Sequence, residues 1–400
     1  MRPALDCMNN TDSIASRISD LMANPNPDQF SEVIKTGWLS RIGGSLIGFV
    51  VGIILIALSI TALSWNEHRA VQAFKALERG LGAVVTVSAS SINEKNDQRL
   101  VYLTGPLSSA KSAFDPAMNF AVKNAIRLQR DVAMYQWVEQ ITEKTTNLVG
   151  GSQTTEKVYE YVQAWVSIPQ NSKQFKIPAG HQNPPMPLRS ETFNATSITL
   201  GAFALDPAFV EKIDTFESAL DADKPPAGYQ RFSDAFYRSR DPSQPEIGDL
   251  RITYQAAIAK DYSIVAKQSN GALAPYKDQS GYVIALLEAG QISAANLFAQ
   301  QGQTETALTW MGRILGLLFI FLGLRLLFGP IEMLAAVLPF LQSIVGFSAG
   351  VVAFLLALPI TLVTIAIAWL YVRPAIGIGL VLLSVFTVFT LRKLLQNKTT

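Results

Sequence analysis

The chain has 400 residues, of which 49% are hydrophobic and only 16% charged, and its formal net charge is +2. A net charge so close to zero, without dense Lys/Arg runs, gives no basic surface, so we expect no nucleic-acid partner. The single cysteine, Cys7, excludes an intrachain disulfide and a cysteine-based zinc site. Most charges lie between Asn66 and Glu305, with the apolar excess outside that range, which indicates a water-facing domain between membrane segments.

Residues 42–65 form the first apolar segment and carry no charge. As a helix this segment spans about 36 Å, which is enough to cross a bilayer. A secretory signal peptide is the alternative, because "ALS" before Trp65 loosely resembles a cleavage site. The apolar run is too long for a signal peptide and starts after a polar tail. We therefore expect a retained membrane helix, preceded by a cytoplasmic tail with a juxtamembrane part at residues 1–41.

Three further apolar segments follow the domain, at residues 308–328, 344–371 and 375–391. Arg313 and Arg325 lie near the two ends of the first of these, about 18 Å apart along a helix axis. Because long basic side chains reach for the polar layer, we expect each arginine to extend toward its own membrane interface.

Prolines divide this C-terminal part. Pro374 marks the turn between the last two segments, because proline restricts the residue before it and lacks the N–H that a continuing helix would use. Pro359 interrupts the segment at residues 344–371. Residues 329–342 are too short and too broken by proline to cross a bilayer, so we expect an interfacial or re-entrant piece.

Four spans place both chain ends on the same side of the membrane. Lys35 and Arg41 precede the first span and residues 392–400 form a basic tail, so we expect both ends in the cytoplasm. The domain at residues 66–305 then lies outside the cytosol. That means the periplasm at a bacterial inner membrane or, alternatively, the lumen of the endoplasmic reticulum or nuclear envelope.

Glycines recur at four-residue spacing within the apolar segments. Such spacing lines one helix face with backbone and lets a second helix approach closely. The predicted helix-packing residues are Gly44, Gly48, Gly52, Gly312, Gly316, Gly346 and Gly350. The sequence leaves open whether these contacts form within one chain or between chains, and chance pairing in glycine-rich membrane helices is the alternative.

The sequence of the water-facing domain predicts an α+β fold that is rich in antiparallel strands. Alternation predicts one strand over about Asn124–Gln140 and a second over Val158–Ile168, with Gly150-Gly151 in the polar connection. A hairpin there brings Trp137 near Trp165. Aromatic pairs of this kind ordinarily stabilise the strand ladder, although a face that docks on membrane or a partner is the alternative.

The sequence also predicts other turns, helices and strands of the domain. Asn270-Gly271 is a strong hairpin-turn signal. Asp206-Pro207 is a good start for a helix whose apolar face runs through Phe209, Ile213, Phe216 and Leu220. Further strands are expected at Val84–Ala89, Arg99–Thr104, Leu250–Tyr254, Tyr262–Gln268 and Tyr282–Leu287.

Signals for catalysis are weak. Of the two histidines, His68 lies beside the membrane, and His181 would need Ser190 or Ser167 as a nucleophile without any G-x-S-x-G elbow to support it. Two histidines and one cysteine make a zinc site improbable, and no phosphate-binding glycine loop is present. We expect no enzymatic activity, no cofactor and no metal site.

Several motifs resemble the LUMA, or transmembrane protein 43, family. They are "MYQWVE" (Met134–Glu139), "NSKQF" (Asn171–Phe175) with "GHQNP" (Gly180–Pro184), "PEIGDLRITY" (Pro245–Tyr254) and "WLYVRP" (Trp369–Pro374). The similarity runs from about residue 36 to the C-terminus, and the order of one span, a large domain and three spans also looks like that family. We expect a prokaryotic member of the family, in keeping with a bacterial inner membrane.

The resemblance implies an integral membrane protein with its large domain outside the cytosol. Eukaryotic members are associated with the endoplasmic reticulum and inner nuclear membrane, self-associate, and bind emerin and lamins. No catalytic residues come with the resemblance. We therefore expect a self-associating membrane scaffold whose partners are the bilayer, other copies of itself and other membrane proteins. A channel or transporter formed by the four spans is the alternative, and a hydrolase using His181 is a weaker one.

Overall fold

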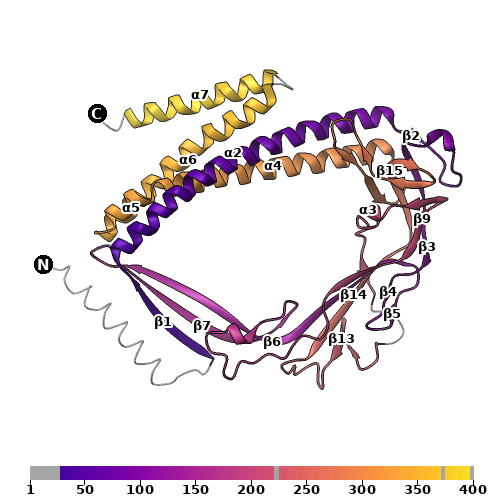
Figure 1. The fold of residues 1–400 in the computed structure, drawn as a ribbon, viewed down its shortest axis with the longest axis horizontal. Coiled ribbons are helices and arrows are strands. Elements are labelled where there is room, and N and C mark those ends of the chain that lie inside the picture. The colour runs from indigo at the N-terminus through magenta and orange to yellow at the C-terminus, as the bar shows by residue number, and fades with distance from the viewer. Residues whose placement is uncertain (1–27, 220–224, 371–373, 397–400) are drawn as a thin grey trace.

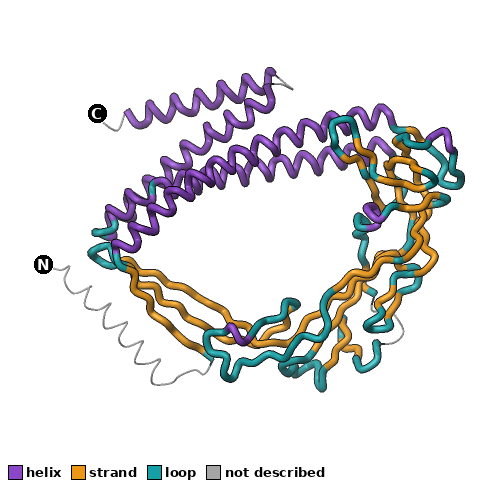
Figure 2. Tube along the Cα trace, viewed as in Figure 1, coloured by secondary structure: helices purple, strands orange, loops and turns teal. Residues whose placement is uncertain are grey.

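The computed structural model describes residues 28–219, 225–370 and 374–396. Its chain forms a strand-rich body and a layer of long helices (Figure 1). The helices of the layer are α2 (Trp38–Ala83), α4 (Ala294–Leu327), α5 (Gly329–Ala335), α6 (Pro339–Leu370) and α7 (Pro374–Gln396). Helices α2 and α4 run side by side, α6 crosses them, and α7 is the outermost (Figures 1 and 2).

The apolar composition explains the helical layer, since a helix that is apolar on all sides is stable only inside a protein or a membrane. Within the described residues, three helices are long and apolar enough to cross a bilayer, namely α2, α4 and α6. In α7 only a shorter apolar stretch, Gly377–Thr387, is found. The expected strand-rich domain is confirmed, whereas the expectation of four spans is not.

The helices are longer than the apolar segments that predict them. Helix α2 contains residues 42–65 and continues into the body as far as Ala83, where Val84 N–H donates to Gly80 O. Helix α4 contains residues 308–328 except the last, and it begins where the Ser293 hydroxyl accepts from Asn296 N–H. Among the later segments, residue 371 and residues 397–400 lie outside the described residues.

The larger sheet has the strand order β1-β7-β6-β14-β13-β12, with β8 also on β6 and β11 on β14. Its longest member, β6 (Ala125–Asn147), forms a hairpin with β7 (Gln153–Val166). The hairpin is as predicted. Tyr135 lies opposite Trp165, and Trp137 lies opposite Gln163, two residues along β7 from Trp165. The other strands are β8 (Glu191–Asn194), β11 (Glu217–Ser218), β12 (Gln230–Phe232), β13 (Ala235–Arg238) and β14 (Leu250–Ile258).

One strand of this sheet comes from the predicted cytoplasmic tail. Strand β1 (Gln29–Thr36) pairs antiparallel with β7 along its whole length, from Gln29 opposite Glu160 to Thr36 opposite Gln153. The prediction that residues 1–41 form a tail separate from the domain is therefore wrong for residues 29–36. Residues 1–27 lie outside the described residues.

The second sheet has the order β19-β15-β16-β10-β9-β3-β2. Asn270, with φ of 48°, and Gly271, with φ of 79°, make the predicted turn between β15 and β16. The strands are β2 (Val85–Thr86), β3 (Leu100–Lys111), β9 (Thr196–Leu200), β10 (Phe203–Leu205), β15 (Asp261–Ser269), β16 (Ala272–Ala274) and β19 (Leu286–Ala289). Two minor pairs are β4 (Phe114–Asp115) with β5 (Phe120–Ala121), and β17 (Tyr276–Lys277) with β18 (Val283–Ile284).

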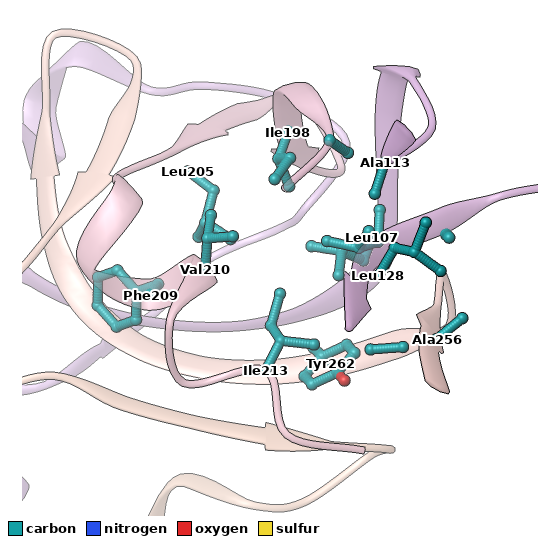
Figure 3. Close-up of a cluster of buried hydrophobic side chains, with 14 of the residues drawn as sticks. Leu107, Ala113, Leu128, Ile198, Leu205, Phe209, Val210, Ile213, Ala256 and Tyr262 are labelled. Atoms are coloured by element: carbon teal, nitrogen blue, oxygen red, sulfur yellow. The ribbon is translucent and has the colours of Figure 1, made fainter. Parts of the chain in front are cut away.

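The two sheets share one buried apolar core, part of which is seen in Figure 3. Leu107 and Leu128 meet there from different sheets, together with Phe209 of helix α3 (Pro207–Val210). The Asp206 carboxylate caps α3 by accepting from Ala208 N–H at 2.9 Å, as the sequence predicts. The helix ends at Val210 and is therefore shorter than its apolar spacing suggests, and Leu220 lies outside the described residues.

Candidate functional site

One buried carboxylate joins three helices of the layer. Glu67 of α2 is 0% exposed and receives two bonds from Arg313 of α4, Nε to Oε1 at 2.7 Å and Nη2 to Oε2 at 2.8 Å. Trp369 of α6 donates its indole N–H to the same carboxylate at 2.6 Å. We call these three residues the polar lock. A buried ion pair that also has its remaining oxygen satisfied holds the three helices in one arrangement.

A second set of polar contacts extends the polar lock toward the body. Arg69 of α2 pairs with Glu305 of α4, which is 4% exposed. Glu305 also accepts from the Tyr282 hydroxyl at 2.9 Å. Burial and this carboxylate raise the pKa of Tyr282 to about 12, so its hydroxyl stays protonated as a donor at neutral pH. The two long helices are thus bound to each other and to the strand-rich body at this level.

Polar contacts also gather at the opposite end of the layer. Arg325 of α4 pairs with Glu332 of α5. The Trp38 indole N–H, at the start of α2, donates to Met333 O at 2.8 Å. Arg313 and Arg325, which are expected to extend toward separate membrane interfaces, are each held by a carboxylate of the same chain. Opposite charges at the ends of apolar segments were the signal in the sequence. Glu332 follows Arg325 by seven residues, whereas Glu67 lies 246 residues before Arg313.

The predicted glycine contacts can be located in the α2–α4 pair. A Cβ on Gly52 would lie 2.6 Å from Gly323 O, so the two backbones approach closely within one chain. A Cβ on Gly312 would meet the Asn66 side chain at 2.5 Å, and one on Gly316 would meet Leu63 at 3.1 Å. Gly323 was not predicted, because it stands seven residues after Gly316 rather than four.

The other predicted glycines lie in looser surroundings. The nearest atom to a Cβ would be Leu326 Cδ2 at 3.6 Å for Gly48, Glu332 Oε1 at 3.4 Å for Gly346 and Arg325 Nε at 3.8 Å for Gly350. For Gly44, no atom of the described residues lies within 4 Å. Close packing between α2 and α4 therefore centres on Gly52 and Gly323.

Replacing Gly52 with alanine is expected to destabilise the helix pair by about 1–3 kcal/mol, because the neighbouring atom is backbone and the helices must separate to admit a methyl group. Gly44→Ala is the matched control on the same helix. It has open space around it and is expected to gain up to about 1 kcal/mol from helix propensity. The thermal unfolding midpoint in detergent distinguishes the two variants, and equal midpoints would contradict the close contact.

In the body, three of the motif segments that carry the family resemblance meet beside β6. Strand β14 and the residues just before it cover one edge of β6 only as far as Tyr135. Beyond Tyr135, residues 170–183, which we call the loop clasp, lie along that edge. The Asn183 side chain accepts from Trp137 N–H at 2.8 Å and donates to Trp137 O at 2.9 Å. One side chain thus takes the place of a neighbouring strand at this residue. Gly248 N–H also donates to Tyr135 O, which brings in the motif at Pro245–Tyr254.

His181 is buried inside the loop clasp, 3% exposed. Its ring stacks on Tyr161 with centroids 3.9 Å apart and meets the edge of Trp137 at 4.8 Å. Its two ring nitrogens lie 3.0 Å from Ile177 O and 3.1 Å from Asp28 Oδ1. Ser190, one of the possible nucleophiles, instead accepts from Val132 N–H. In the part of the chain that the structure describes, His181 therefore contacts aromatic rings, a carbonyl and the residue before β1.

Burial and the neighbouring Glu139 carboxylate raise the pKa of Tyr161 to about 12. Its hydroxyl donates to Glu139 at 2.9 Å and accepts from Ile177 N–H at 2.7 Å. Glu139 also accepts from Lys176 N–H at 2.6 Å. These bonds anchor the middle of the loop clasp to the β6–β7 hairpin.

Removing the Asn183 side chain is expected to loosen the loop clasp, because the Trp137 N–H and C=O both lose their hydrogen-bond partner on that edge. A buried backbone group left without a partner costs about 1–3 kcal/mol. In Asn183→Ala we expect faster hydrogen exchange at the Trp137 amide and earlier proteolytic cleavage within residues 170–183. Gln182→Ala changes the adjacent exposed residue and should leave both rates unaltered. The same protection in both variants would refute this role for Asn183.

A third buried polar group lies between the body's strands. Arg130 of β6, 2% exposed, pairs with Asp115, 0% exposed, and donates to Arg189 O at 2.9 Å. The Tyr254 hydroxyl donates to Asp115 at 2.7 Å. Burial, followed by the bond to Asp115, raises the Tyr254 pKa. In the described residues no group of three or more His, Cys, Asp or Glu side chains is placed to hold a metal ion.

Apolar helices tied to a strand-rich body by buried ion pairs define an integral membrane protein with a large polar domain. The sequence comparisons name the family. The family model for transmembrane protein 43 matches residues 134–374, and the chain belongs to the transmembrane protein 43 family.

The relatives are animal proteins. The chain is 32% identical over 356 residues to transmembrane protein 43 of Mus musculus, covering 85% of this chain and 88% of that protein. It is 31% identical to the Homo sapiens protein with the same coverage. It is also 31% identical over 361 residues to the transmembrane protein 43 homolog of Drosophila melanogaster, covering 88% and 94% of the two chains. No solved structure matches the chain.

Proposed function

We propose that the protein is a non-enzymatic membrane scaffold that self-associates through its outer helices and holds a rigid strand-rich body at the membrane surface. The observation that carries the proposal is the apolar surface that α6 and α7 leave exposed. Phe347 of α6 is 77% exposed, and Phe389 and Leu382 of α7 are 64% and 63% exposed. An aromatic surface of this kind suits packing against another helix as well as against lipid.

The polar lock supports the scaffold role, because it ties Trp369 of α6 to α2 and α4, and these two helices continue into the body. A neighbour that binds α6 and α7 would therefore also set the position of the body. The close glycine contact between Gly52 and Gly323 is already used within the chain. We assign α6 and α7 as the surface for a second copy.

The particle mass in a lipid disc tests the proposal. We expect a multiple of 43.6 kDa, and a smaller particle when Phe347 and Phe389 are both changed to alanine. Phe49→Ala, an exposed aromatic change on α2, is the control and should keep the wild-type mass. A monomer at every protein concentration would overturn self-association.

A channel or transporter is the second candidate, and the polar lock is the observation that favours it. Ionisable residues within a helical membrane layer often mark ion or solute pathways. In the same layer, Pro359 lies inside the continuous helix α6, and its carbonyl accepts from the Ser384 hydroxyl of α7 at 3.3 Å. Flux of ions or small solutes into liposomes that hold the purified protein distinguishes the candidates. Flux no greater than that of empty liposomes would contradict the channel or transporter candidate.

For the location, the relatives' organisms favour a eukaryotic membrane over a bacterial inner membrane. We therefore place the protein in the endoplasmic reticulum and nuclear envelope, with the body in the lumen. Co-localisation of a tagged chain with markers of these membranes tests the placement, and a plasma-membrane signal alone would contradict it.

A further inference from the structure

The chain before the first apolar helix is an integral part of the body. Strand β1 pairs with β7 over all its residues. Glu32 of β1 also forms an ion pair with Lys176 of the loop clasp at 2.7 Å, and Asp28 lies 3.1 Å from His181. Segments from before and after α2 therefore form one folded unit.

Both ends of the apolar stretch of α2 are attached to this unit. Only Gly37 separates β1 from α2, and Arg41 donates to Gly151 O at 2.6 Å at the tip of the β6–β7 hairpin. Gly150 N–H at the same tip donates to Val337 O at 2.9 Å. At its other end α2 enters the body, where Leu77 packs in a buried cluster. Figure 1 shows the α2–α4 pair closing a ring with the two sheets.

The strands that close this ring are unsuited to hydrocarbon. Residues 140–147 of β6 are exposed on both faces, and among the described strands β1 is the end of its sheet. A sheet edge with free backbone groups does not occur in contact with lipid, and charged side chains there are rare and costly. The charged residues of β1, β7 and the last part of β6, residues 139–147, are Glu32, Lys35, Glu139, Glu143, Lys144, Glu156, Lys157 and Glu160.

We propose that α2 and α4 form a membrane-embedded arch, which enters and leaves the bilayer on the side that holds the body. Residues before α2 then lie on the same side of the membrane as residues 66–305, and the partner of the arch is the lipid of the adjoining leaflet. This inference is independent of self-association. It replaces the arrangement in which α2 carries the chain from one side to the other.

Side chains at the two ends of the arch suit one headgroup layer. Trp38 marks the start of the apolar stretch, and Trp65 and Trp310 mark the other end. Tryptophan is enriched where helices meet that layer. At the hairpin tip, Leu148 and Val149 are 41% and 78% exposed beside α5, so an otherwise polar hairpin ends in apolar residues. These tip residues are placed to dip into the same surface.

The first experiment tests the strand pairing in the membrane. In a Cys7→Ser background, Ser31→Cys with Val158→Cys places cysteines on directly paired residues of β1 and β7. We expect an oxidant to cross-link them in intact membranes. The control, Ser31→Cys with Gln163→Cys, uses a residue displaced along β7 and should stay uncross-linked. Equal cross-linking in both variants, or none in the first, would overturn the proposal.

The second experiment reads sidedness within single molecules. The variant Ser91→Cys has two thiols, an exposed one on the body and the natural Cys7. Cys7 reports the side on which β1 lies, because residues 8–27 contain no apolar run that could cross a bilayer. Sealed liposomes are treated with a membrane-impermeant maleimide from outside, and intact masses are measured. We expect molecules with either zero or two labels, whatever the mixture of insertion directions. A population dominated by single labels puts the two thiols on opposite sides and overturns the arch, even where the cross-link forms.

Discussion

Replacing Glu67 with glutamine is expected to destabilise the helical layer by about 3–5 kcal/mol, because it leaves the Arg313 guanidinium, whose side chain is only 16% exposed, without its counter-charge. The variant also weakens the acceptor for the Trp369 indole. The measurement is the thermal unfolding midpoint in a lipid disc, followed by size-exclusion of the heated sample.

Two variants control this prediction. Glu78→Gln removes an exposed charge from the same helix and should shift stability by no more than about 0.5 kcal/mol. The double variant Glu67→Gln with Arg313→Met should recover part of the loss, because an apolar replacement of a whole buried ion pair is often neutral. A Glu67→Gln midpoint equal to that of Glu78→Gln would show that the polar lock does not hold the layer.

Asp115→Ala is expected to cost the body a similar amount, about 3–5 kcal/mol, because Arg130 is 2% exposed and loses its buried partner carboxylate. Among the carboxylates of the described residues it keeps only Glu191, whose side chain is 59% exposed. The Tyr254 hydroxyl loses its acceptor in the same change. Loss of hydrogen-exchange protection at the β6 and β14 amides with rising temperature follows melting of the body separately from the helices. Glu288→Ala removes an exposed carboxylate from the second sheet and serves as the control. Coincident melting of both variants would contradict the role of Asp115.

The sequence predicts the helices well, because an uncharged run such as residues 42–65 has few alternatives to a helix in an apolar setting. It also predicts the β6–β7 hairpin and the turn at Asn270-Gly271 from short-range patterns. The exact register, in which Tyr135 lies opposite Trp165 and Trp137 opposite Gln163, was not predicted. Alternation fixes which face a side chain takes, but it leaves shifts by two residues undetermined.

Contacts between distant segments could not be read from the sequence. Strand β1 is a short polar stretch, "QFSEVIKT", whose partner follows only after the whole of α2 and much of the body. Glu67 and Arg313 look like ordinary interfacial charges until α2 and α4 are aligned side by side. His181, met as a loop residue, turns out to be buried because Tyr161 and Trp137 enclose it.

The pairing of β1 with β7 has a consequence for biogenesis. The ribosome makes Gln29–Thr36 before α2, whereas Gln153–Val166 is made much later. The nascent first strand must therefore wait beside the membrane while α2 is released and the long β6 is synthesised. Pairings so far apart along a chain form slowly, so a product truncated before Gln153 carries an edge with no strand to complete it and becomes a substrate for quality control.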